Sequence, residues 1–385
     1  MSPNLTAHMT YPEAIVVGLI QGVTELFPVS SLGHNVLIPA LIGGSWAQDL
    51  SVSAPESPYL AYIVGLHVAT ALALILYFWR DWIRIALGFV SSLRERRIAT
   101  ADQRLAWMII LATIPVGIAG LALEHAFRVV FSKPVPTALF LTLNGVILIG
   151  AERLLRRRPP ASTHAPATQP LVTQLSATQP LAATPPPPSA TGPSNSRPPT
   201  SRPSNSRPPT SRPSTSRPPT TGPSRGDDGL NPPGEPQPAT GSARDAEIAR
   251  AVAADGRLSS ISFGQAVLIG SAQIAALLPG ISRDGIVSVT GMFRGLSRED
   301  AVRFSFLLSA PVILAAGVLK IPDLTGPLGS GIRGQVLVGS LLSFLGAYFS
   351  VRFLTRYFAK DRPLTPFGVY CLLAGLGSLI YLLIR

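Results

Sequence analysis

The chain has 385 residues, of which 46% are hydrophobic and only 14% are charged. This composition excludes an ordinary soluble protein, because several apolar runs approach the ~20 residues that span a bilayer. The formal net charge is +12, but Lys and Arg concentrate in particular loops, which indicates membrane orientation and no nucleic-acid partner. Cys371 is the only cysteine, so no intrachain disulfide is expected.

A polar stretch interrupts the first apolar run at residues 21–34. An ionisable residue such as Glu25 is costly inside a bilayer and usually marks a substrate or ion path. Pro28 removes a backbone donor and disfavours helix at the residue before it, so we expect the helix to end there. The alternative is a continuous helix kinked at the proline. The residues expected on non-helical backbone within the membrane are Ser30, Ser31, Gly33 and His34.

Three apolar spans are predicted next, at residues 59–79, 105–124 and 135–153. Residues 1–10 and 44–58 contain no Lys or Arg, whereas basic residues follow the first and third spans. By the positive-inside rule, the two segments without Lys or Arg are extracytoplasmic and the basic segments are cytoplasmic. The first polar stretch therefore enters and leaves the membrane from outside, as a re-entrant hairpin.

Residues 159–245 are rich in Pro, Ser, Thr and Arg, with a repeated ten-residue pattern. Such a segment cannot bury enough apolar surface to offset its ordering entropy, so we predict a disordered cytoplasmic linker. It divides the chain into a first membrane repeat at 1–158 and a second at 246–385. The linker is interpreted as a tolerated insertion; the alternative is a scaffold that recruits partners.

A second polar stretch, at residues 273–285, repeats the order of the first. Pro279 corresponds to Pro28, and Ser282 follows its proline at the same spacing as Ser31. Basic residues follow it, so it is predicted to be re-entrant from the cytoplasmic face. Three more spans are predicted at 301–320, 336–354 and 367–384.

These elements predict an all-α polytopic membrane protein with two inverted-topology repeats. Each repeat is a re-entrant broken-helix hairpin followed by three transmembrane helices. Because three is odd, the second repeat is inverted, and the two hairpin tips meet within the membrane. The residues brought together are Glu25, Ser31, His34, Ser282, Arg283 and Asp284.

The chemistry of this set suits an anionic headgroup on an apolar chain, such as a phosphate ester or a diphosphate on a lipid. Arg283 offers a fixed, charged fork for phosphate oxygens. Glu25 is a candidate base or metal ligand, and His34 is a candidate acid or base. Glycine amides that are free to approach an anion are also expected. The candidate substrate-binding residues are Gln21, Ser30, Gly33, Gly280, Ser282, Asp284 and Gly285.

Residues 21–34, which read QGVTELFPVSSLGH, resemble the first motif of the undecaprenyl-diphosphatase family, the BacA-type bacitracin-resistance proteins. Residues 278–285, LPGISRDG, resemble its second motif. The resemblance implies hydrolysis of undecaprenyl diphosphate to the monophosphate with a divalent cation, Mg²⁺ or Ca²⁺. It implies that Arg283 clamps the diphosphate, that Ser31 is the nucleophile, and that Glu25 and His34 activate it, protonate the leaving group or hold the metal. Water activated by Glu25 is the alternative nucleophile.

Three positions depart from the family pattern: Gln21 replaces a frequent Glu, Asp284 a Ser and Val287 a Thr. Asp284 is expected either to neutralise Arg283 or to bind the cation together with Glu25. The resemblance places the protein in the bacterial plasma membrane, and the topology places its site toward the extracytoplasmic side. A homodimer is compatible with the sequence. A polyprenyl-phosphate transporter or flippase that uses the same two hairpins is the alternative function.

Overall fold

The computed structural model describes residues 9–50, 58–126, 133–157, 243–319, 326 and 331–385. The predicted linker therefore lies outside the described residues, except for its last three positions, which begin a helix. The chain divides into one compact unit of Met1–Ala161 with Gly241–Arg385 and a second unit, Ser162–Thr240, which falls among the residues that are not described. Both predicted membrane repeats therefore belong to one unit.

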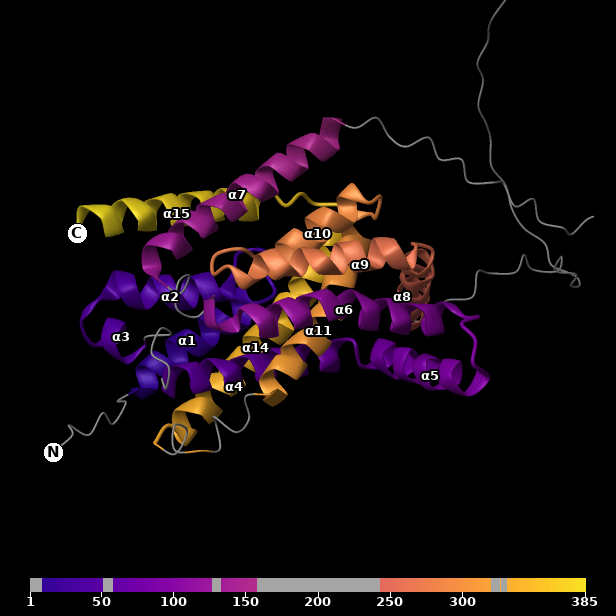
Figure 1. Ribbon diagram of the computed structural model, residues 1–385, viewed down its shortest axis with the longest axis horizontal. Helices are drawn as coiled ribbons and strands as arrows, with labels where there is room; N and C mark the ends of the chain where they lie inside the picture. Colours follow the sequence, from indigo (N-terminus) through magenta and orange to yellow (C-terminus); the bar gives the residue numbers. More distant parts are fainter. Residues whose placement is uncertain (1–8, 51–57, 127–132, 158–242, 320–325, 327–330) are drawn as a thin grey trace, which may run out of the picture. The chain divides into compact units, whose positions relative to one another are not determined.

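Regular structure in the described ranges is helical (Figure 1). The helices before the linker are α1 (Tyr11–Thr24), α2 (Ser31–Ile42), α3 (Gly44–Asp49), α4 (Pro58–Tyr77), α5 (Trp79–Glu95), α6 (Ala101–Ala126) and α7 (Pro134–Arg157). Those after it are α8 (Ala243–Ser259), α9 (Phe263–Ser271), the 3₁₀ helix η2 (Ala272–Leu277), α10 (Arg283–Phe293), α11 (Arg298–Leu319), α14 (Arg333–Phe358) and α15 (Thr365–Ile384).

Five of these helices are long and apolar enough to cross a membrane, and up to seven spans result if each of two sharply bent helix pairs counts as one. The five are α6, α7, α11, α14 and α15, and they match five of the six predicted spans. Large apolar side chains are exposed along them, for example Leu121 and Leu337. Exposed apolar surface of this extent is expected of helices that face lipid.

The sixth predicted span, 59–79, is only partly right. Its helix α4 ends at Tyr77, and the chain bends by 86° into α5. The sequence interpretation treated residues 80–104 as a basic loop, and this was wrong for most of the segment. In α5 the residues Asp81, Ile85 and Gly88 are buried on one face, a helical spacing that the charges at its start concealed.

The first polar stretch does break, as predicted, although part of the break is itself helical. Helix α1 ends at Thr24, turns follow through Val29, and α2 begins at Ser31. Only Ser30 among the four predicted residues is non-helical, with φ of 69°. Its hydroxyl accepts a hydrogen bond from the Gly33 amide, which makes it the N-cap of α2. The prediction of non-helical backbone at Ser31, Gly33 and His34 was therefore wrong.

The second polar stretch follows the same plan. Helix α9 passes into η2, and the chain then turns at Gly280, whose φ is 113°. Ser282 caps α10 by accepting a hydrogen bond from the Gly285 amide at 3.2 Å. Each polar stretch thus ends in a serine-capped helix that starts inside the unit, with its N-terminal amides directed at the break.

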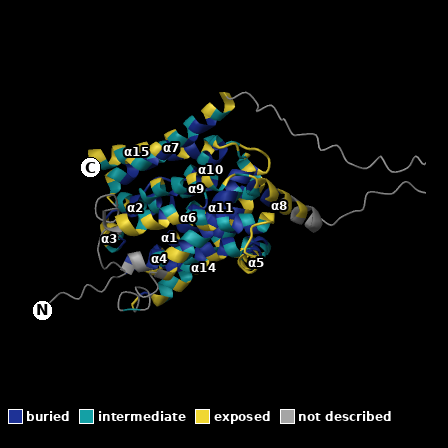
Figure 2. Ribbon diagram, turned by 45° about the vertical axis from the view of Figure 1, so that its right-hand side comes forward, coloured by how far each residue is buried: buried dark blue, intermediate teal, exposed yellow. Residues whose placement is uncertain are grey.

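The helices pack across the two halves of the chain. Helix α1 packs against α14, α9 against α6, and α7 against α15, and α7 and α15 lie side by side in Figure 1. At Gly18 a Cβ atom would lie 2.6 Å from the carbonyl oxygen of Gly339, so the two backbones of α1 and α14 touch. Figure 2 shows the buried residues on the faces where the helices meet. The broken segments are held in this interior.

Candidate active site

The two polar breaks contact each other, as the sequence predicts. The Arg283 Nη2 donates to Glu25 Oε1 at 2.6 Å. The Gly280 amide donates to the Ser30 hydroxyl at 3.1 Å, and the Ser282 hydroxyl to the carbonyl of Phe27 at 3.4 Å. A carboxylate from one half and a guanidinium from the other therefore form a charge-assisted pair at the junction.

Glu25 is the centre of the cluster and is 7% exposed. Besides Arg283, its carboxylate accepts hydrogen bonds from the Ser31 hydroxyl and, at 2.8 Å, from the Gln21 amide. The Gln21 oxygen in turn accepts from the Asn35 amide at 2.6 Å. The buried charge is thus compensated by donors from both sides, which is the condition for keeping a carboxylate ionised away from water.

His67 also contacts Glu25, with its Nε2 at 3.4 Å from Oε2, and the sequence interpretation missed it. Its Nδ1 lies 2.8 Å from the carbonyl oxygen of Ile63, and a carbonyl only accepts, so Nδ1 carries a proton. A favourable contact from Nε2 to a carboxylate requires a second proton. The signal was present in the sequence, since His67 is an ionisable residue inside the apolar run 59–79.

His34 lies apart from Ser31 and Glu25 in its hydrogen bonding. Its Nδ1 is 2.7 Å from the carbonyl oxygen of Ser30 and its Nε2 is 2.7 Å from the Tyr370 hydroxyl. Both ring nitrogens are satisfied if Nδ1 donates and Tyr370 donates to Nε2, which describes a neutral imidazole. No hydrogen bond in the described residues joins His34 to the carboxylate, although both belong to the first motif.

The glycine amides are not free, contrary to the prediction. The amides of Gly33 and Gly280 both donate to the Ser30 hydroxyl, and the amide of Gly285 donates to Ser282. The absence of a side chain at these glycines instead allows close approach of neighbouring backbone. At Gly280 a Cβ atom would lie 2.6 Å from the amide nitrogen of Leu141 on α7, so a side chain would push the two elements apart.

Asp284 does not form an ion pair with Arg283, so the expectation of direct neutralisation was wrong. Its Oδ1 accepts from the hydroxyls of Ser305 and Ser309 on α11, at 2.5 and 2.7 Å. The Oδ2 atom of Asp284 is buried and has no hydrogen-bond partner among the described residues. The carboxylate thus keeps one oxygen available to a cation or a water.

The described ranges contain no group of three or more His, Cys, Asp or Glu side chains that could hold a metal ion. Glu25 and Asp284 nevertheless supply carboxylate oxygens, the ligands that Mg²⁺ and Ca²⁺ prefer, and Mg²⁺ is commonly held by one or two carboxylates plus substrate phosphates. Both oxygens of Glu25 already accept hydrogen bonds, so the Oδ2 atom of Asp284 is the unpartnered one. The role of the two carboxylates as cation ligands stays a prediction.

Two further hydrogen-bond donors lie where the broken segments meet, one on Asn144 and one on Arg283. The Asn144 amide on α7 donates to the carbonyl of Pro28 at 3.1 Å, and its oxygen accepts from the Ser282 amide, also at 3.1 Å. Asn144 therefore ties both broken segments to the same helix. The Nε of Arg283 is buried without a hydrogen-bond partner in the described structure, so the guanidinium retains a donor for a further acceptor.

Fold and site together define a multi-pass helical membrane protein with a buried Ser–Glu–Arg cluster where two broken helices meet. The model of the bacitracin resistance protein BacA family matches residues 14–185 and 244–377. The chain belongs to this family.

Relatives of the chain match along nearly its whole length. An undecaprenyl-diphosphatase from Mycolicibacterium paratuberculosis is 52% identical over 99% of this chain and 100% of the relative. Undecaprenyl-diphosphatase 2 of Frankia alni is 48% identical over 95% of the chain and 96% of the relative. A third relative of that name, from Chromobacterium violaceum, is 32% identical over 97% and 99%.

Proposed function

We propose that the chain hydrolyses undecaprenyl diphosphate to undecaprenyl phosphate and inorganic phosphate, which recycles the lipid carrier of cell-wall synthesis and confers bacitracin resistance. The observation that carries this proposal is the Glu25 carboxylate, which accepts from the Ser31 hydroxyl and from Arg283 in one buried cluster. The names of the relatives support it. A carrier needs an anion clamp but no hydroxyl activated by a carboxylate, so the transporter interpretation gains no support.

In the proposed mechanism, Arg283 binds the diphosphate through donors that Glu25 does not occupy, which include its unpartnered Nε. Glu25 takes the proton of Ser31 as the Ser31 oxygen attacks the terminal phosphorus. The bond from that phosphorus to the bridging oxygen breaks, and the lipid monophosphate leaves. Glu25 then loses the proton it gained to solvent, and water releases phosphate from the serine with the ionised Glu25 again as the base. Direct attack by water with Glu25 as base is the alternative, and it uses the same contacts.

The leaving monophosphate oxygen requires charge compensation or a proton. His67 is the better placed of the two histidines, because its Nε2 lies 3.4 Å from the Glu25 carboxylate, whereas the ring of His34 contacts the Ser30 carbonyl and the Tyr370 hydroxyl. We assign the acid role to His67 and a positioning role to His34, which holds the Ser30 carbonyl at the break. This assignment replaces the role that the family resemblance implied for His34.

A divalent cation, Mg²⁺ or Ca²⁺, is proposed to bind with the diphosphate, with Glu25 and the free oxygen of Asp284 as protein ligands. When bound, it neutralises charge that develops on the phosphate oxygens. The remaining proposed substrate contacts are those predicted from sequence: Gln21, Ser30, Gly33, Gly280, Ser282 and Gly285. Of these, Gln21 has an indirect role, because its side-chain amide donates to Glu25 and orients the carboxylate.

The fold is proposed to consist of two inverted repeats, residues 1–158 and 246–385, each a re-entrant hairpin and three spans. The helix pairs support this, because they recur with the halves exchanged: α1 packs on α14 and α9 packs on α6, while α7 and α15 pack on each other. The distribution of basic residues supports a site that faces the extracytoplasmic side of the plasma membrane. A homodimer stays a prediction.

The first test is phosphate release from a long-chain polyprenyl diphosphate by purified protein in detergent, with Mg²⁺ or Ca²⁺. Glu25→Gln removes the base and Arg283→Ala removes the clamp, so each variant should lose at least about 10²-fold in kcat. Arg333→Gln, at the exposed start of α14, is the control and should retain the activity. No release by folded wild-type protein would contradict the proposed function.

A further inference from the structure

A cavity of about 580 Å³ lies where four helices end or begin. It is lined by the end of α4, the start of α5, the first turns of α11 and the last turns of α14. This volume lies within the range of roughly 300–1,000 Å³ that ligand pockets have. None of the residues of the Ser–Glu–Arg cluster lines it.

The distance between this cavity and Glu25 can be estimated from residue positions along two helices. On α4, the cavity residue Tyr77 follows His67 by ten positions, which corresponds to about 15 Å along a helix. On α14, the cavity residue Thr355 follows Ser343 by twelve positions, or about 18 Å, and Ser343 is where α14 touches Gly22 on α1. The cavity is therefore a separate site.

The lining of this cavity is strongly cationic. Five arginines contribute to it: Arg80, Arg84, Arg303, Arg352 and Arg356. Two carboxylates oppose them, Asp81 and Glu299. The formal charge of the lining is therefore positive, which favours an anionic ligand.

Two of the five arginines are already neutralised. Arg84 and Arg303 both contact Asp81, at 2.5 and 3.1 Å. Both also contact Asp255 of α8, at 2.5 and 2.8 Å. With a further contact from Arg84 to Asp102 at 3.4 Å, these ion pairs form a network beside the cavity.

The other three arginines have no carboxylate partner within the described ranges. Arg80 stacks on the Trp79 ring, with 5.1 Å from its guanidinium carbon to the ring centroid. Arg352 and Arg356 are exposed, one helical turn apart on α14. Two guanidinium groups that repel each other on one helix face, with a third on another helix that lines the same cavity, are stabilised by a shared anion.

The remaining wall is aromatic. Tyr77, Phe78 and Tyr348 line it, and the Tyr77 hydroxyl hydrogen-bonds the Thr355 hydroxyl at 2.8 Å. A smaller hollow of about 290 Å³ adjoins Arg352 and Arg356 on the other side, lined by Phe349 and Phe353, which are 64% and 52% exposed. A free phosphate ion would fill little of this space, whereas a phosphate ester with an apolar chain would contact both walls.

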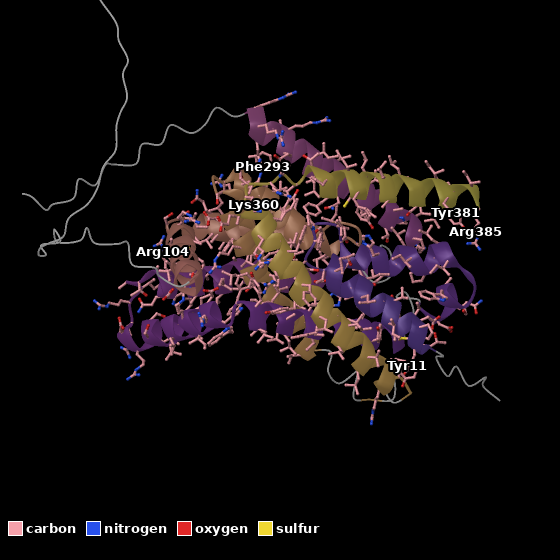
Figure 3. All side chains as sticks on the ribbon, turned by 180° about the vertical axis from the view of Figure 1, so that it is seen from behind. Tyr11, Arg104, Phe293, Lys360, Tyr381 and Arg385 are labelled. Carbon is pink, nitrogen blue, oxygen red and sulfur yellow. The ribbon has the colours of Figure 1, made fainter. Side chains whose placement is uncertain are left out.

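We propose that this cavity binds an anionic phosphate group through Arg80, Arg352 and Arg356. The anion has two sources, a phosphorylated membrane lipid or free phosphate, and the aromatic walls favour the lipid. The site is distinct from the Ser–Glu–Arg cluster, and its existence does not depend on the hydrolytic function. Figure 3 labels Lys360, which follows these arginines in the chain, on the side of the view away from Tyr11 and Arg385.

The test measures binding of a short-chain isoprenyl monophosphate to purified full-length protein in detergent. All proteins carry Arg283→Ala, which removes the clamp of the first site. The double variant Arg352→Gln/Arg356→Gln should weaken binding by about tenfold or more, because two charge-assisted contacts are lost. The matched control is Arg333→Gln, an exposed arginine at the other end of the same helix, which should change the affinity by less than about twofold.

Three probes separate the sources. Binding of the monophosphate but not of the parent alcohol, with inorganic phosphate a weak competitor, supports a lipid phosphate. If inorganic phosphate competes as well as the isoprenyl monophosphate itself, the ligand of the cavity is free phosphate. Absence of saturable binding to the Arg283→Ala protein, or binding that the double variant leaves unchanged, would overturn the proposal. If the double variant does not fold by size-exclusion chromatography, the single variants decide, each with an expected loss of about threefold.

Discussion

Glu25 shows how one residue acquires its chemistry from four neighbours. Gln21 and Ser31 are local in sequence, whereas His67 and Arg283 come from other helices. The local pair orients the carboxylate, and the distant pair compensates its charge. A carboxylate with this set of donors stays ionised in an apolar interior, which a general base requires.

His67→Gln tests the acid role at the residue scale. The amide keeps the approximate size of the ring but cannot donate a proton, so kcat should fall by about 10- to 100-fold, while the KM for the diphosphate changes little. Steady-state phosphate release measures both constants. Tyr370→Phe is the matched control for His34, since it removes only the partner of Nε2; a larger loss there than in His67→Gln would reverse the assignment.

Asp284→Asn tests the free carboxylate oxygen. The amide can still accept from Ser305 and Ser309, so the fold should persist, but the negative charge is lost. The concentration of Mg²⁺ or Ca²⁺ for half-maximal phosphate release should rise by about tenfold. An unchanged cation requirement would exclude Asp284 from the cation site and leave it as a partner of α11 alone.

At the scale of elements, backbone contact between helices decides how the broken segments are held. Helix α1 lies on α14 through Gly18 and Gly22, and α9 lies on α6 through Gly270. These contacts leave no room for a β-carbon, so small residues here bring a helix of one half directly onto a helix of the other. Gly295 has no such role: nothing lies within 4 Å of its Cβ position, and its φ of 95° marks a turn.

Gly18→Ala tests this contact. The added carbon meets the Gly339 backbone, which cannot rotate away, so α1 and α14 must separate at a cost of about 1–3 kcal/mol. The melting temperature in detergent should fall. Gly117→Ala is the matched helical control on α6, where nothing lies within 4 Å, and it should leave the melting temperature unchanged or slightly higher. Equal effects of the two variants would show that helix propensity, and not the contact, is responsible.

At the scale of the whole molecule, the site depends on both halves, because Glu25 and Ser31 belong to one and Arg283 to the other. The family model leaves residues 186–243 unmatched, which is most of the predicted linker, although it includes residues 159–185. The described contacts of the site come from the unit Met1–Ala161 with Gly241–Arg385. We therefore expect catalysis to be independent of the predicted linker.

Removal of Ser162–Thr240, with a short Gly/Ser connection in its place, should leave phosphate release within about twofold of the intact chain, because a flexible connection of this kind allows both repeats to assemble. The measurement is kcat/KM for the polyprenyl diphosphate. A loss of most activity in a deletion variant that elutes as folded protein would favour the scaffold interpretation of the linker.

The sequence by itself determined the apolar spans, the two breaks and the contact between Glu25 and Arg283. These follow from local chemistry: hydrophobic length predicts a span, proline predicts a break, and a polar motif repeated in both halves predicts a shared site. The one mispredicted span was 59–79, which was followed by a predicted loop. The charged residues after it indicated a loop, whereas the spacing of the buried residues in that segment was that of the helix α5.

Only the tertiary structure decided which donors reach Glu25 and which do not. Sequence spacing cannot show that Tyr370 is the hydrogen-bond partner of His34, or that the Ser30 hydroxyl accepts from the amides of Gly33 and Gly280. Nor can it show that His67 on α4 contacts the carboxylate of Glu25. Each of these contacts except that of Gly33 joins different elements. Their partners depend on how the helices of the two halves pack, and that packing is a property of the whole chain.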